Sequence, residues 1–392
     1  MRVVQTVLGK AHHFHLARQL HQRGMLTAIF SSYPSWKLRN QHVPMDLVHV
    51  FPYVHMAYLA SVRYGSTRST LSRELAWWTA RTLDGYVMSL LPECDVFVGH
   101  SAAGLKTGRL TQQRGGKYIC DRGSSHIRWS AQTMTEEFAR WGQELAGDYP
   151  KYITHEEQEY DQADLITVPS EFARRTYIEM GVPADKIKKV PYGSDMSRFA
   201  KVAEPALDSF DVLFVGQVSF RKGIPYLLEA FAKLRHPKKT LTIVGTVQPE
   251  INRYLQGKSF EDVKFVGARP HVRLKELMSR SHVMVLPSLE EGLALVQGEA
   301  MACGCPIIGS ENTGGEDLFD DGYEGFIVPI RDSDAITERL ERLAQDPALR
   351  NEMSARGLER VARIGGWETY GRDYVAVLET VTTPAARREA SV

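Results

Sequence analysis

Two glutamates stand eight positions apart in the stretch SLEEGLALVQGEAMACGCPII. The apolar run before them, Val283 to Leu286, predicts a buried strand; a short loop then carries Glu291, and a helix beginning near Leu293 carries Glu299. Eight residues of mostly helical rise span at most about 12 Å. This length is comparable to that from the ribose of a nucleotide to a sugar on its diphosphate. Each carboxylate can therefore accept hydrogen bonds from a pair of hydroxyl groups.

The start of that helix offers a second kind of chemistry. Gly292 and Leu293 stand where the first helical turn leaves its backbone N–H groups without partners inside the helix. These groups, together with the positive end of the helix dipole, favour a negatively charged ligand such as a diphosphate. Single glutamates at helix starts are commonplace, so this interpretation depends on the strand, the loop and the helix together.

A second set of polar residues follows the first predicted strand. Gly9 lets the backbone approach a ligand closely, and His12 and His13 stand at the head of the next helix. Histidines at this spacing suggest a metal, but no carboxylate accompanies them. We therefore expect contacts to an acceptor or a phosphate, with ordinary surface histidines as the alternative.

Three more polar residues follow later strands of the same half. His100 comes after VFVG, at the edge of the expected cleft, and Asp121 and His126 come after YIC. We take Asp121 and His126 as candidate catalytic residues and His100 as a candidate for acceptor binding. Helix capping and hydrogen bonds within the core are the alternative roles.

Short apolar runs alternate with segments of helical period along the whole chain, which is typical of parallel strands joined by crossover helices. In the first half, strands are predicted at Val3 to Leu8, Leu26 to Ser31, Val96 to Val98, Tyr118 to Cys120, Leu165 to Val168 and Lys188 to Val190. In the second half, they are predicted at DVLFVG, LTIVG, VKFVG, VMVLP, PIIG and GFIVP. The predicted class is α/β, with two Rossmann-like doubly wound domains that face a cleft.

These segments resemble the retaining GT-B glycosyltransferases of the large "group 1" family. The family signature E-G-[FL]-[AG]-x-x-x-x-E-A-M-A-x-G-x-P fits the chain from Glu291 to Pro306. GQVSFRKGIPYLLEAF is similar to the family's phosphate-binding segment, with Lys222 as its lysine, and GGEDLFDDGYEGFIVP is similar to the run after the signature. The opening loop LGKAHHFH matches more loosely, with Gly9 as its glycine.

The resemblance implies a role for each matching residue. Glu299 would bind the ribose hydroxyls, Glu291 would hold hydroxyls of the donor sugar, and Lys222 would neutralise the diphosphate as it leaves. Most members have Arg where this chain has Gln217, so the second positive charge is expected from Arg221.

Asp121 is the nearest match to a polar residue that contacts the acceptor or the donor sugar in many relatives, although His is common at that place. No D-x-D motif follows a strand, so we expect no metal on the diphosphate and no cofactor. Charge stabilisation then depends on the cationic side chains and on helix dipoles.

The resemblance also divides the chain. Residues 1–203 would form the acceptor-side domain and residues 204–366 the domain that binds the nucleotide sugar. Residues 367–392 would form a helix that crosses back to the first domain, followed by a disordered tail. A polar, turn-rich connection predicts a hinge near residues 198–208.

The composition is that of a globular protein. The chain has 392 residues, of which 43% are hydrophobic and 24% charged, which excludes disordered, collagen-like and disulfide-scaffold classes. No apolar window reaches the roughly 18 residues of a membrane span. The opening MRVVQTVLGKAHHFH ends its apolar run too early for a secretory signal, so we expect a cytoplasmic protein. The four cysteines fit no zinc pattern and are expected to be reduced thiols.

The charge is uneven along the chain. Up to residue 128 there are 16 Lys and Arg against 6 Asp and Glu, and after it 32 against 41. A basic front half favours anionic partners, such as phosphate-bearing substrates or an acidic membrane face, although solubility alone is an alternative. We expect no nucleic-acid partner.

The function that the resemblance implies is transfer of a sugar, with retention, from a nucleotide-diphosphate sugar to a hydroxyl acceptor. Cell-surface polysaccharide or glycolipid synthesis is the expected setting. The candidate acceptors include lipid-linked molecules, and the candidate locations include a peripheral position on the inner membrane face. Two alternatives stay open. A nucleotide-sugar epimerase of the same fold would convert the donor without an acceptor, and a non-catalytic sugar-binding protein would turn nothing over.

Overall fold

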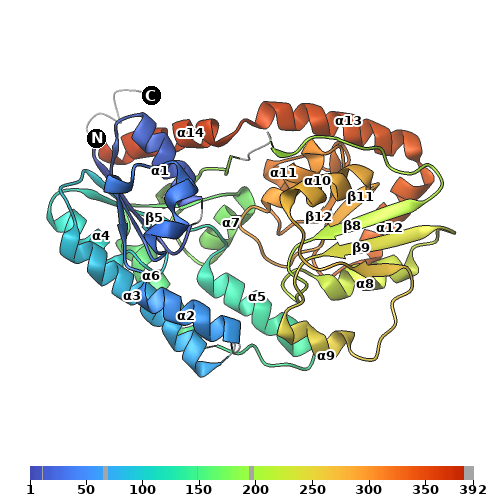
Figure 1. Ribbon diagram of the computed structural model, residues 1–392, viewed down its shortest axis with the longest axis horizontal. Coiled ribbons are helices and arrows are strands. Elements are labelled where there is room, and N and C mark those ends of the chain that lie inside the picture. The colour runs from blue at the N-terminus through green and yellow to red at the C-terminus, as the bar shows by residue number, and fades with distance from the viewer. Residues whose placement is uncertain (11, 65–68, 148, 194–197, 384–392) are drawn as a thin grey trace.

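Two parallel β-sheets follow one another along the chain, and helices cover both faces of each (Figure 1). The computed structural model describes residues 1–10, 12–64, 69–147, 149–193 and 198–383. In each sheet the first strand lies inside, and the chain builds outward in one direction and then in the other, as in doubly wound folds. The predicted fold class is confirmed.

The first sheet has seven strands in the order β3-β2-β1-β4-β5-β6-β7, and every neighbouring pair is parallel. The strands are β1 (Val3–Val7), β2 (Leu26–Ser31), β3 (Val48–Val50), β4 (Val96–His100), β5 (Lys117–Asp121), β6 (Leu165–Val168) and β7 (Ile187–Lys189). All six strands predicted for this half are present. Sequence analysis missed β3, because its three residues VHV are only partly buried and make no apolar run.

The second sheet has six strands in the order β10-β9-β8-β11-β12-β13, again all parallel. The strands are β8 (Phe210–Val215), β9 (Lys239–Val244), β10 (Val263–Phe265), β11 (Val283–Leu286), β12 (Ile307–Ser310) and β13 (Gly325–Val328). Every strand predicted for this half is present. Ligands of such sheets bind outside the carboxyl ends of the strands where the order reverses, here beside β8 and β11 and beside β1 and β4.

Helices of the first half pack on both faces of the first sheet. They are α1 (His13–Gln22), α2 (Tyr53–Tyr64), α3 (Thr70–Leu90), α4 (Leu105–Gln113), α5 (Ile127–Arg140), α6 (Tyr149–Gln162) and α7 (Glu171–Glu179). Short 3-10 turns lie at Ser35–Lys37, Arg39–Gln41, Met45–Leu47 and Ala184–Lys186. Ser170 begins α7, because its hydroxyl accepts a hydrogen bond of 3.0 Å from the N–H of Ala173.

Helices of the second half cover the second sheet in the same way. They are α8 (Ile224–Lys233), α9 (Asn252–Leu255), α10 (His271–Arg280), α11 (Leu295–Ala302), α12 (Ser333–Gln345) and α13 (Pro347–Ile364), with 3-10 turns at Pro249–Ile251 and Gly315–Asp317. The helix after Glu291 begins at Leu295, not near Leu293 as predicted. Ala294 stays extended because its N–H donates to the carbonyl of Thr313 at 3.1 Å.

Two helices leave the half of the chain to which they belong in sequence (Figure 1). The last one, α14 (Trp367–Thr382), packs along α1 and buries Tyr374 and Leu378 in the core of the first sheet. In the other direction, α5 buries Met134 and Phe138 in the core of the second sheet. The tail predicted to be disordered falls in residues 384–392, outside the described residues.

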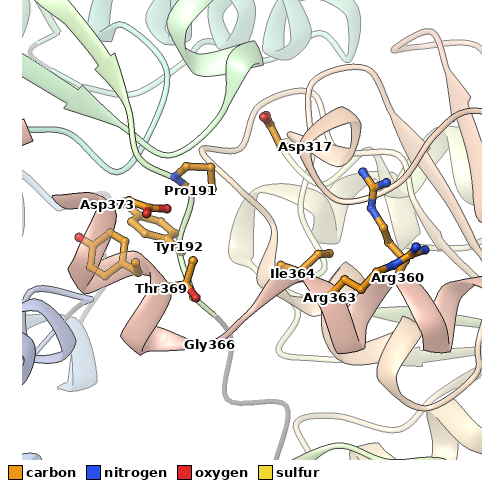
Figure 2. Close-up of a pocket in the computed structure, with 11 residues that line it drawn as sticks. Pro191, Tyr192, Asp317, Arg360, Arg363, Ile364, Gly366, Thr369 and Asp373 are labelled. Carbon is orange, nitrogen blue, oxygen red and sulfur yellow. The ribbon is translucent and has the colours of Figure 1, made fainter. Parts of the chain in front are cut away.

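The segment around Gly193 and the segment around Gly366, which both connect the two sheets, contact each other. A Cβ atom on Gly193 would lie 2.5 Å from the backbone of Gly366. Figure 2 shows the cavity of about 470 Å³ beside this contact, with Arg360 and Arg363 on one side and Asp373 on the other. In the described part of the chain, no helix is both long enough and apolar enough to cross a membrane.

Candidate active site

The strand-end turn after β8 and the loop after β11 meet in a cluster of charges. The ammonium group of Lys222 contacts Oε1 of Glu291, and Nη1 of Arg221 lies 3.0 Å from the same oxygen. The turn can reach the loop because it contains Gly223, whose φ is +67°. A Cβ atom there would lie 2.0 Å from the carbonyl oxygen of Pro287. The fold thus brings Arg221 and Lys222 to the first signature glutamate.

This cluster is mostly buried, and its charges determine its protonation. Burial alone would raise the pKa of Glu291, but the charges of Lys222 and Arg221 outweigh burial, and the net effect is a lowered pKa. The side chains of Glu291 and Lys222 are only 13% and 12% exposed, so solvent screens this attraction little. Glu291 is therefore a carboxylate at physiological pH, ready to accept hydrogen bonds from hydroxyl groups.

Glu299 has a different environment on α11. Burial raises its pKa to about 7, and its carboxylate has no ion pair within the described ranges. Glu299 lines a cavity of about 590 Å³ between the two sheets. Its other lining residues come from both halves of the chain and are rich in basic groups: Lys10, His15, Arg18, Asn40, Gln41, His42, Arg198, Phe199, His271, Leu295 and Trp367. Glu291 is not among them, so the two signature glutamates face different surroundings.

Gly292 and Leu293 connect the loop to the first half of the chain. A Cβ atom on Gly292 would lie 1.9 Å from the carbonyl oxygen of Gly123, so only glycine allows the two loops to approach this closely. The carbonyl of Gly292 also accepts a hydrogen bond of 2.5 Å from Ser170. The side chain of Leu293 is buried in the core.

Sequence analysis missed Glu290, which joins the two halves directly. Its buried carboxylate accepts hydrogen bonds from the hydroxyl of Ser124, and from the hydroxyl and the N–H of Ser125 at 2.7 and 3.3 Å. Nη1 of Arg221 donates to the carbonyl of Glu290 at 2.7 Å. The loop after β5 is therefore tied to the same turn that carries Lys222. The adjacent glutamates of SLEEG were the only sequence signal for this link.

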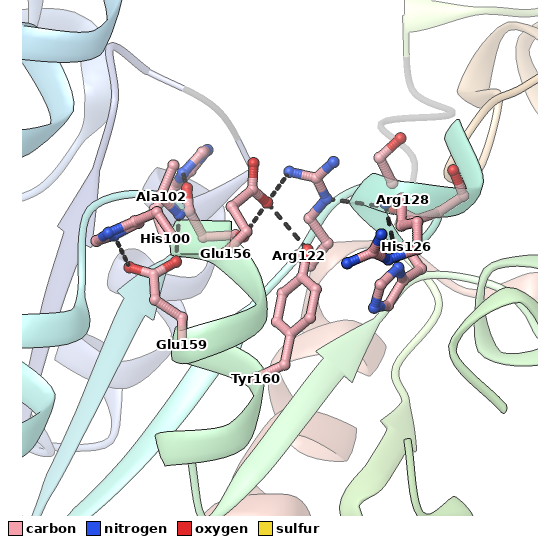
Figure 3. Close-up of polar contacts among 12 residues, drawn as sticks. His100, Ala102, Arg122, His126, Arg128, Glu156, Glu159 and Tyr160 are labelled. Atoms are coloured by element: carbon pink, nitrogen blue, oxygen red, sulfur yellow. Dashed lines mark hydrogen bonds and ion pairs between the residues drawn. The ribbon is translucent and has the colours of Figure 1, made fainter. Parts of the chain in front are cut away.

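A buried polar network holds the loops after β4 and β5 (Figure 3). Oε2 of Glu156, on α6, accepts hydrogen bonds from Arg122 at 2.5 Å, from Ser101 at 2.6 Å and from Tyr160 at 2.9 Å. Arg122 in turn donates to the carbonyl of Ser125 at 3.3 Å. Because the network is buried and each link is hydrogen-bonded, it fixes the loop that reaches Glu290.

Glu159, one turn further along α6, holds the loop after β4. It accepts hydrogen bonds from the N–H groups of Ala102 at 2.5 Å and Gly104 at 2.8 Å (Figure 3). Burial raises the pKa of Glu159. These contacts fix the backbone that follows His100, whose own Nδ1 donates to the carbonyl of Ser101 at 2.7 Å.

Asp121, at the end of β5, meets the two histidines of the opening loop. Its Oδ2 lies 2.9 Å from Nε2 of His12 and 3.1 Å from Nε2 of His13, and its Oδ1 accepts a hydrogen bond of 2.8 Å from Thr167. The expectation that no carboxylate accompanies these histidines is wrong. Asp121 is 109 positions away from His12 in sequence, and the parallel order β1-β4-β5 brings both to one edge of the sheet.

Burial and charge determine the protonation of Asp121 and of the histidines near it. Burial would raise the pKa of Asp121, but His12 and His13 hold it well below its usual value. Burial lowers the pKa of His13, and the nearby His12 lowers it further. The ring of His100 lies 5.0 Å from that of His13, and burial lowers its pKa to about 4. Asp121 is thus a carboxylate near two imidazoles, those of His13 and His100, whose lowered pKa favours the neutral form.

Gly9 and His126 complete the predicted set. Gly9 has a φ of +78° and donates its N–H to the hydroxyl of Ser32 at 2.8 Å, which explains the glycine before α1. His126 caps α5, because its Nδ1 accepts from the N–H of Arg128 at 3.2 Å, and it lines a separate cavity of about 340 Å³. Burial lowers the pKa of His126 to about 4. The structure thus gives His126 the capping contact that sequence analysis kept as its alternative.

Residues 196–360 match the sequence model of the family described as "Glycosyl transferases group 1". This segment of the chain therefore carries the sequence pattern of that family. The matched range includes Arg221, Lys222, Glu291 and Glu299, so the group 1 signature and the observed charge cluster fall in the same segment.

Curated relatives match part of the length of this chain. The amylovoran biosynthesis glycosyltransferase AmsK of Erwinia amylovora is 27% identical over 213 residues, which cover 51% of this chain and 51% of AmsK. The phosphatidyl-myo-inositol mannosyltransferase of Mycolicibacterium smegmatis is 31% identical over 222 residues, which cover 54% of this chain and 56% of that protein. The chain thus spans about half the length of these curated relatives.

Solved structures match nearly the whole chain. Sucrose-phosphate synthase from Thermosynechococcus elongatus has a TM-score of 0.70 at 20% identity, covering 97% of this chain and 99% of that one. Anabaena HepE, solved in complex with UDP-glucose, has a TM-score of 0.66 at 17% identity, covering 97% and 100%. These likenesses show the GT-B fold.

Proposed function

We propose that this protein is a retaining glycosyltransferase that moves a sugar from a nucleotide-diphosphate donor to a hydroxyl acceptor. The observation that carries the proposal is the partly buried cluster of Arg221, Lys222 and Glu291 at the carboxyl ends of β8 and β11. It presents two cations for a diphosphate and one carboxylate for sugar hydroxyls. We call these three residues the donor wall.

The remaining donor contacts are proposed from the family resemblance. Glu299 binds the ribose hydroxyls, and the backbone N–H groups of Gly292 and Leu293 approach the diphosphate. Gly9 brings the opening loop close to the same groups. Because Glu291 already holds both cations, donor binding exchanges these internal ion pairs for contacts with phosphate and sugar.

The acceptor contacts are proposed for the first half of the chain. His12, His13 and Asp121, which we call the acceptor wall, lie at the carboxyl ends of β1 and β5, with His100 beside them. Residues 1–203 form the acceptor-side domain, residues 204–366 the donor domain, and the helix from residue 367 returns to the first.

The described activities of relatives support this proposal. AmsK and WcaL are described as glycosyltransferases of amylovoran and colanic acid biosynthesis, and a third relative as a phosphatidyl-myo-inositol mannosyltransferase. HepE has been solved with UDP and with UDP-glucose. We therefore place the reaction in cell-surface polysaccharide or glycolipid synthesis on the cytoplasmic side of the membrane.

A panel of UDP, GDP and ADP sugars tests the proposal. Calorimetry identifies the donor that binds, and turnover with that donor and a set of hydroxyl acceptors follows. NMR of the anomeric proton of the product then reports retention or inversion. Donor conversion without any acceptor would instead indicate the epimerase, and binding without turnover on any acceptor would indicate a sugar-binding protein.

The acceptor is proposed to be lipid-linked, because the first half of the chain combines basic charge with exposed apolar residues. Tyr53 and Tyr64 on α2 and Trp78 on α3 are 74%, 83% and 53% exposed. The adjacent Trp77 instead packs inward, under the guanidinium of Arg81 at 4.6 Å. An exposed aromatic set on a basic domain suits an anionic membrane surface.

A vesicle-binding assay tests the proposed membrane association separately from glycosyl transfer. We expect the protein to bind vesicles that contain phosphatidylglycerol at low salt and to leave them at 1 M salt, where the Debye length is about 3 Å. Trp78→Ser should weaken binding, and Trp77→Ser serves as the matched inward-facing comparison. If the protein ignores anionic vesicles at low salt, the membrane proposal fails while glycosyl transfer stands.

A further inference from the structure

The acceptor wall has the composition of a metal site. Two imidazole nitrogens and one carboxylate oxygen, from His12, His13 and Asp121, all lie within 4.8 Å of one another. Imidazole and carboxylate are common protein ligands of Zn²⁺ and of related divalent transition metals. The group is almost closed to solvent, since the side chains of His12, His13 and Asp121 are 11%, 0% and 4% exposed.

A second observation points to a missing partner. Neither ring nitrogen of His13 has an aligned hydrogen-bond partner, although the side chain is fully buried. The 3.1 Å approach of its Nε2 to Asp121 is therefore a close contact rather than a well-formed hydrogen bond. Buried polar atoms without partners are rare in native proteins and mark places where an ion or a water belongs. An ion bound at the centre would give this nitrogen a partner.

The carboxylate of Asp121 is held by outer hydrogen bonds. Oδ1 of Asp121 accepts from the hydroxyl of Thr167 at 2.8 Å, and that hydroxyl lies 3.1 Å from the hydroxyl of Tyr374. Outer contacts of this kind hold a ligating carboxylate in its orientation. The hydroxyl of Tyr192 lies 3.5 Å from Nε2 of His12.

We infer that His12, His13 and Asp121 bind one divalent transition-metal ion, Zn²⁺ or a metal of similar ligand preference. Two neutral imidazoles and one carboxylate leave a bound divalent ion with one net positive charge. Three protein ligands also leave a fourth position open, as in catalytic zinc sites, where a water or hydroxyl oxygen binds. Mg²⁺ and Ca²⁺ prefer oxygen ligands, so this donor set selects against them.

This inference does not depend on the proposed function, because binding is measured on the protein alone. The competing arrangement has no ion: both Nε2–H groups donate to Asp121, and the group is a hydrogen-bonded cluster. The two arrangements differ in what happens when metal is added. One binds an ion at this place, and the other does not.

The test is a titration of the full chain, expressed without a polyhistidine tag and dialysed against chelator. Co²⁺ is added while visible d–d absorption is recorded, and Zn²⁺ is then added in competition. We expect one Co²⁺ per chain, displaced by one Zn²⁺, and a rise of the thermal midpoint with Zn²⁺. His12→Ala should abolish the signal, and Thr167→Val should weaken binding on the order of 10- to 100-fold.

The control is His21→Ala, an exposed histidine on the same helix. It should bind Co²⁺ like the wild type. Circular dichroism of each variant without metal shows that it is folded, and His12, being slightly exposed, is chosen because its removal disturbs the core least. Absence of Co²⁺ absorption in the wild type, or a folded His12→Ala protein that binds Co²⁺ as tightly as the wild type, would overturn the inference.

Discussion

The two walls of the site each hold a buried carboxylate, but different partners surround them. Glu291 on the donor wall contacts Lys222 and Arg221, whereas Asp121 on the acceptor wall contacts two histidines. Lysine and arginine stay charged throughout the physiological pH range, while imidazole does not. The donor wall is thus a permanent ion cluster, and the charge of the acceptor wall depends on what it binds.

This difference suits different ligands. A diphosphate always carries negative charge, so a site for it benefits from cations that never titrate. A hydroxyl acceptor is neutral, and a site for it can use groups that exchange a proton or coordinate an ion. Glu290 connects the two walls, because it reaches Ser124 and Ser125 from the loop that carries Glu291.

The largest effect is expected when the donor wall loses its permanent charge. Lys222→Met leaves Glu291 with Arg221 alone and removes a cation from the leaving diphosphate. Removal of one such stabilising group costs about 10² to 10³ in kcat. The measurement is steady-state turnover with the donor identified by calorimetry.

Lys233→Met is the matched control, because Lys233 is an exposed lysine on α8. It should keep wild-type turnover. Turnover of Lys222→Met within a few fold of the wild type would mean that the donor wall does not carry the leaving group.

A smaller effect is expected on nucleotide affinity. Glu299→Ala removes a charge-assisted hydrogen bond to ribose worth about 1.5 to 3 kcal/mol, roughly 10- to 150-fold in Kd. Calorimetry with the free nucleotide measures this loss, and Glu359→Ala, at an exposed glutamate on α13, is the control. A folded Glu299→Ala protein with unchanged affinity would remove Glu299 from the ribose site.

Removal of the hydrogen bonds through which Glu290 links the two walls should lower kcat/KM about 10-fold. In the double variant Ser124→Ala and Ser125→Ala, the buried carboxylate of Glu290 loses its hydroxyl donors, at about 1 to 3 kcal/mol. We expect kcat/KM to fall about 10-fold, with Ser89→Ala on α3 as an exposed control. Unchanged kcat/KM would show that the walls act independently.

Glu299 also makes stability depend on pH. Its pKa is raised to about 7 in the folded protein, above the 4.5 of a free glutamate, so the folded state binds the proton more tightly. The stability that the folded state gains from the protonated Glu299 is complete below pH 4.5 and is lost as pH rises through 7. Urea unfolding at pH 5 and pH 8 should show that wild type loses more stability than Glu299→Gln over this range. Parallel losses in the two proteins would contradict the raised pKa.

The smallest effect, none at all, is expected from Mg²⁺ or Mn²⁺ at the donor wall. In the proposed function, Arg221 and Lys222 supply the positive charge that these ions give elsewhere. Turnover in magnesium- and manganese-free buffer should match turnover with either ion added. A strong activation by either ion would contradict this assignment.

The two walls also differ in how far the sequence predicted them. The strands around the donor wall are apolar runs that end in Gly or Pro, so local pattern predicted them. Lys222 and Arg221 were named from the resemblance of their short segment to the group 1 family. The acceptor wall depends on Asp121 reaching His12 across 109 positions, which local pattern does not encode. Glu290 was missed for the same reason, because its partners lie 165 and 166 positions away. β3 was missed because it is short and partly polar.

The return of α14 to the first sheet has a consequence for the order in which the protein is made. Strands β8 to β13 and their helices leave the ribosome as one continuous stretch, whereas the face of the first sheet that α1 covers stays incomplete until residues 367–382 emerge. Domains usually fold in the order of their synthesis. Here the domain translated first is completed last, and during translation the residues that Tyr374 and Leu378 will cover are exposed to solvent and to chaperones.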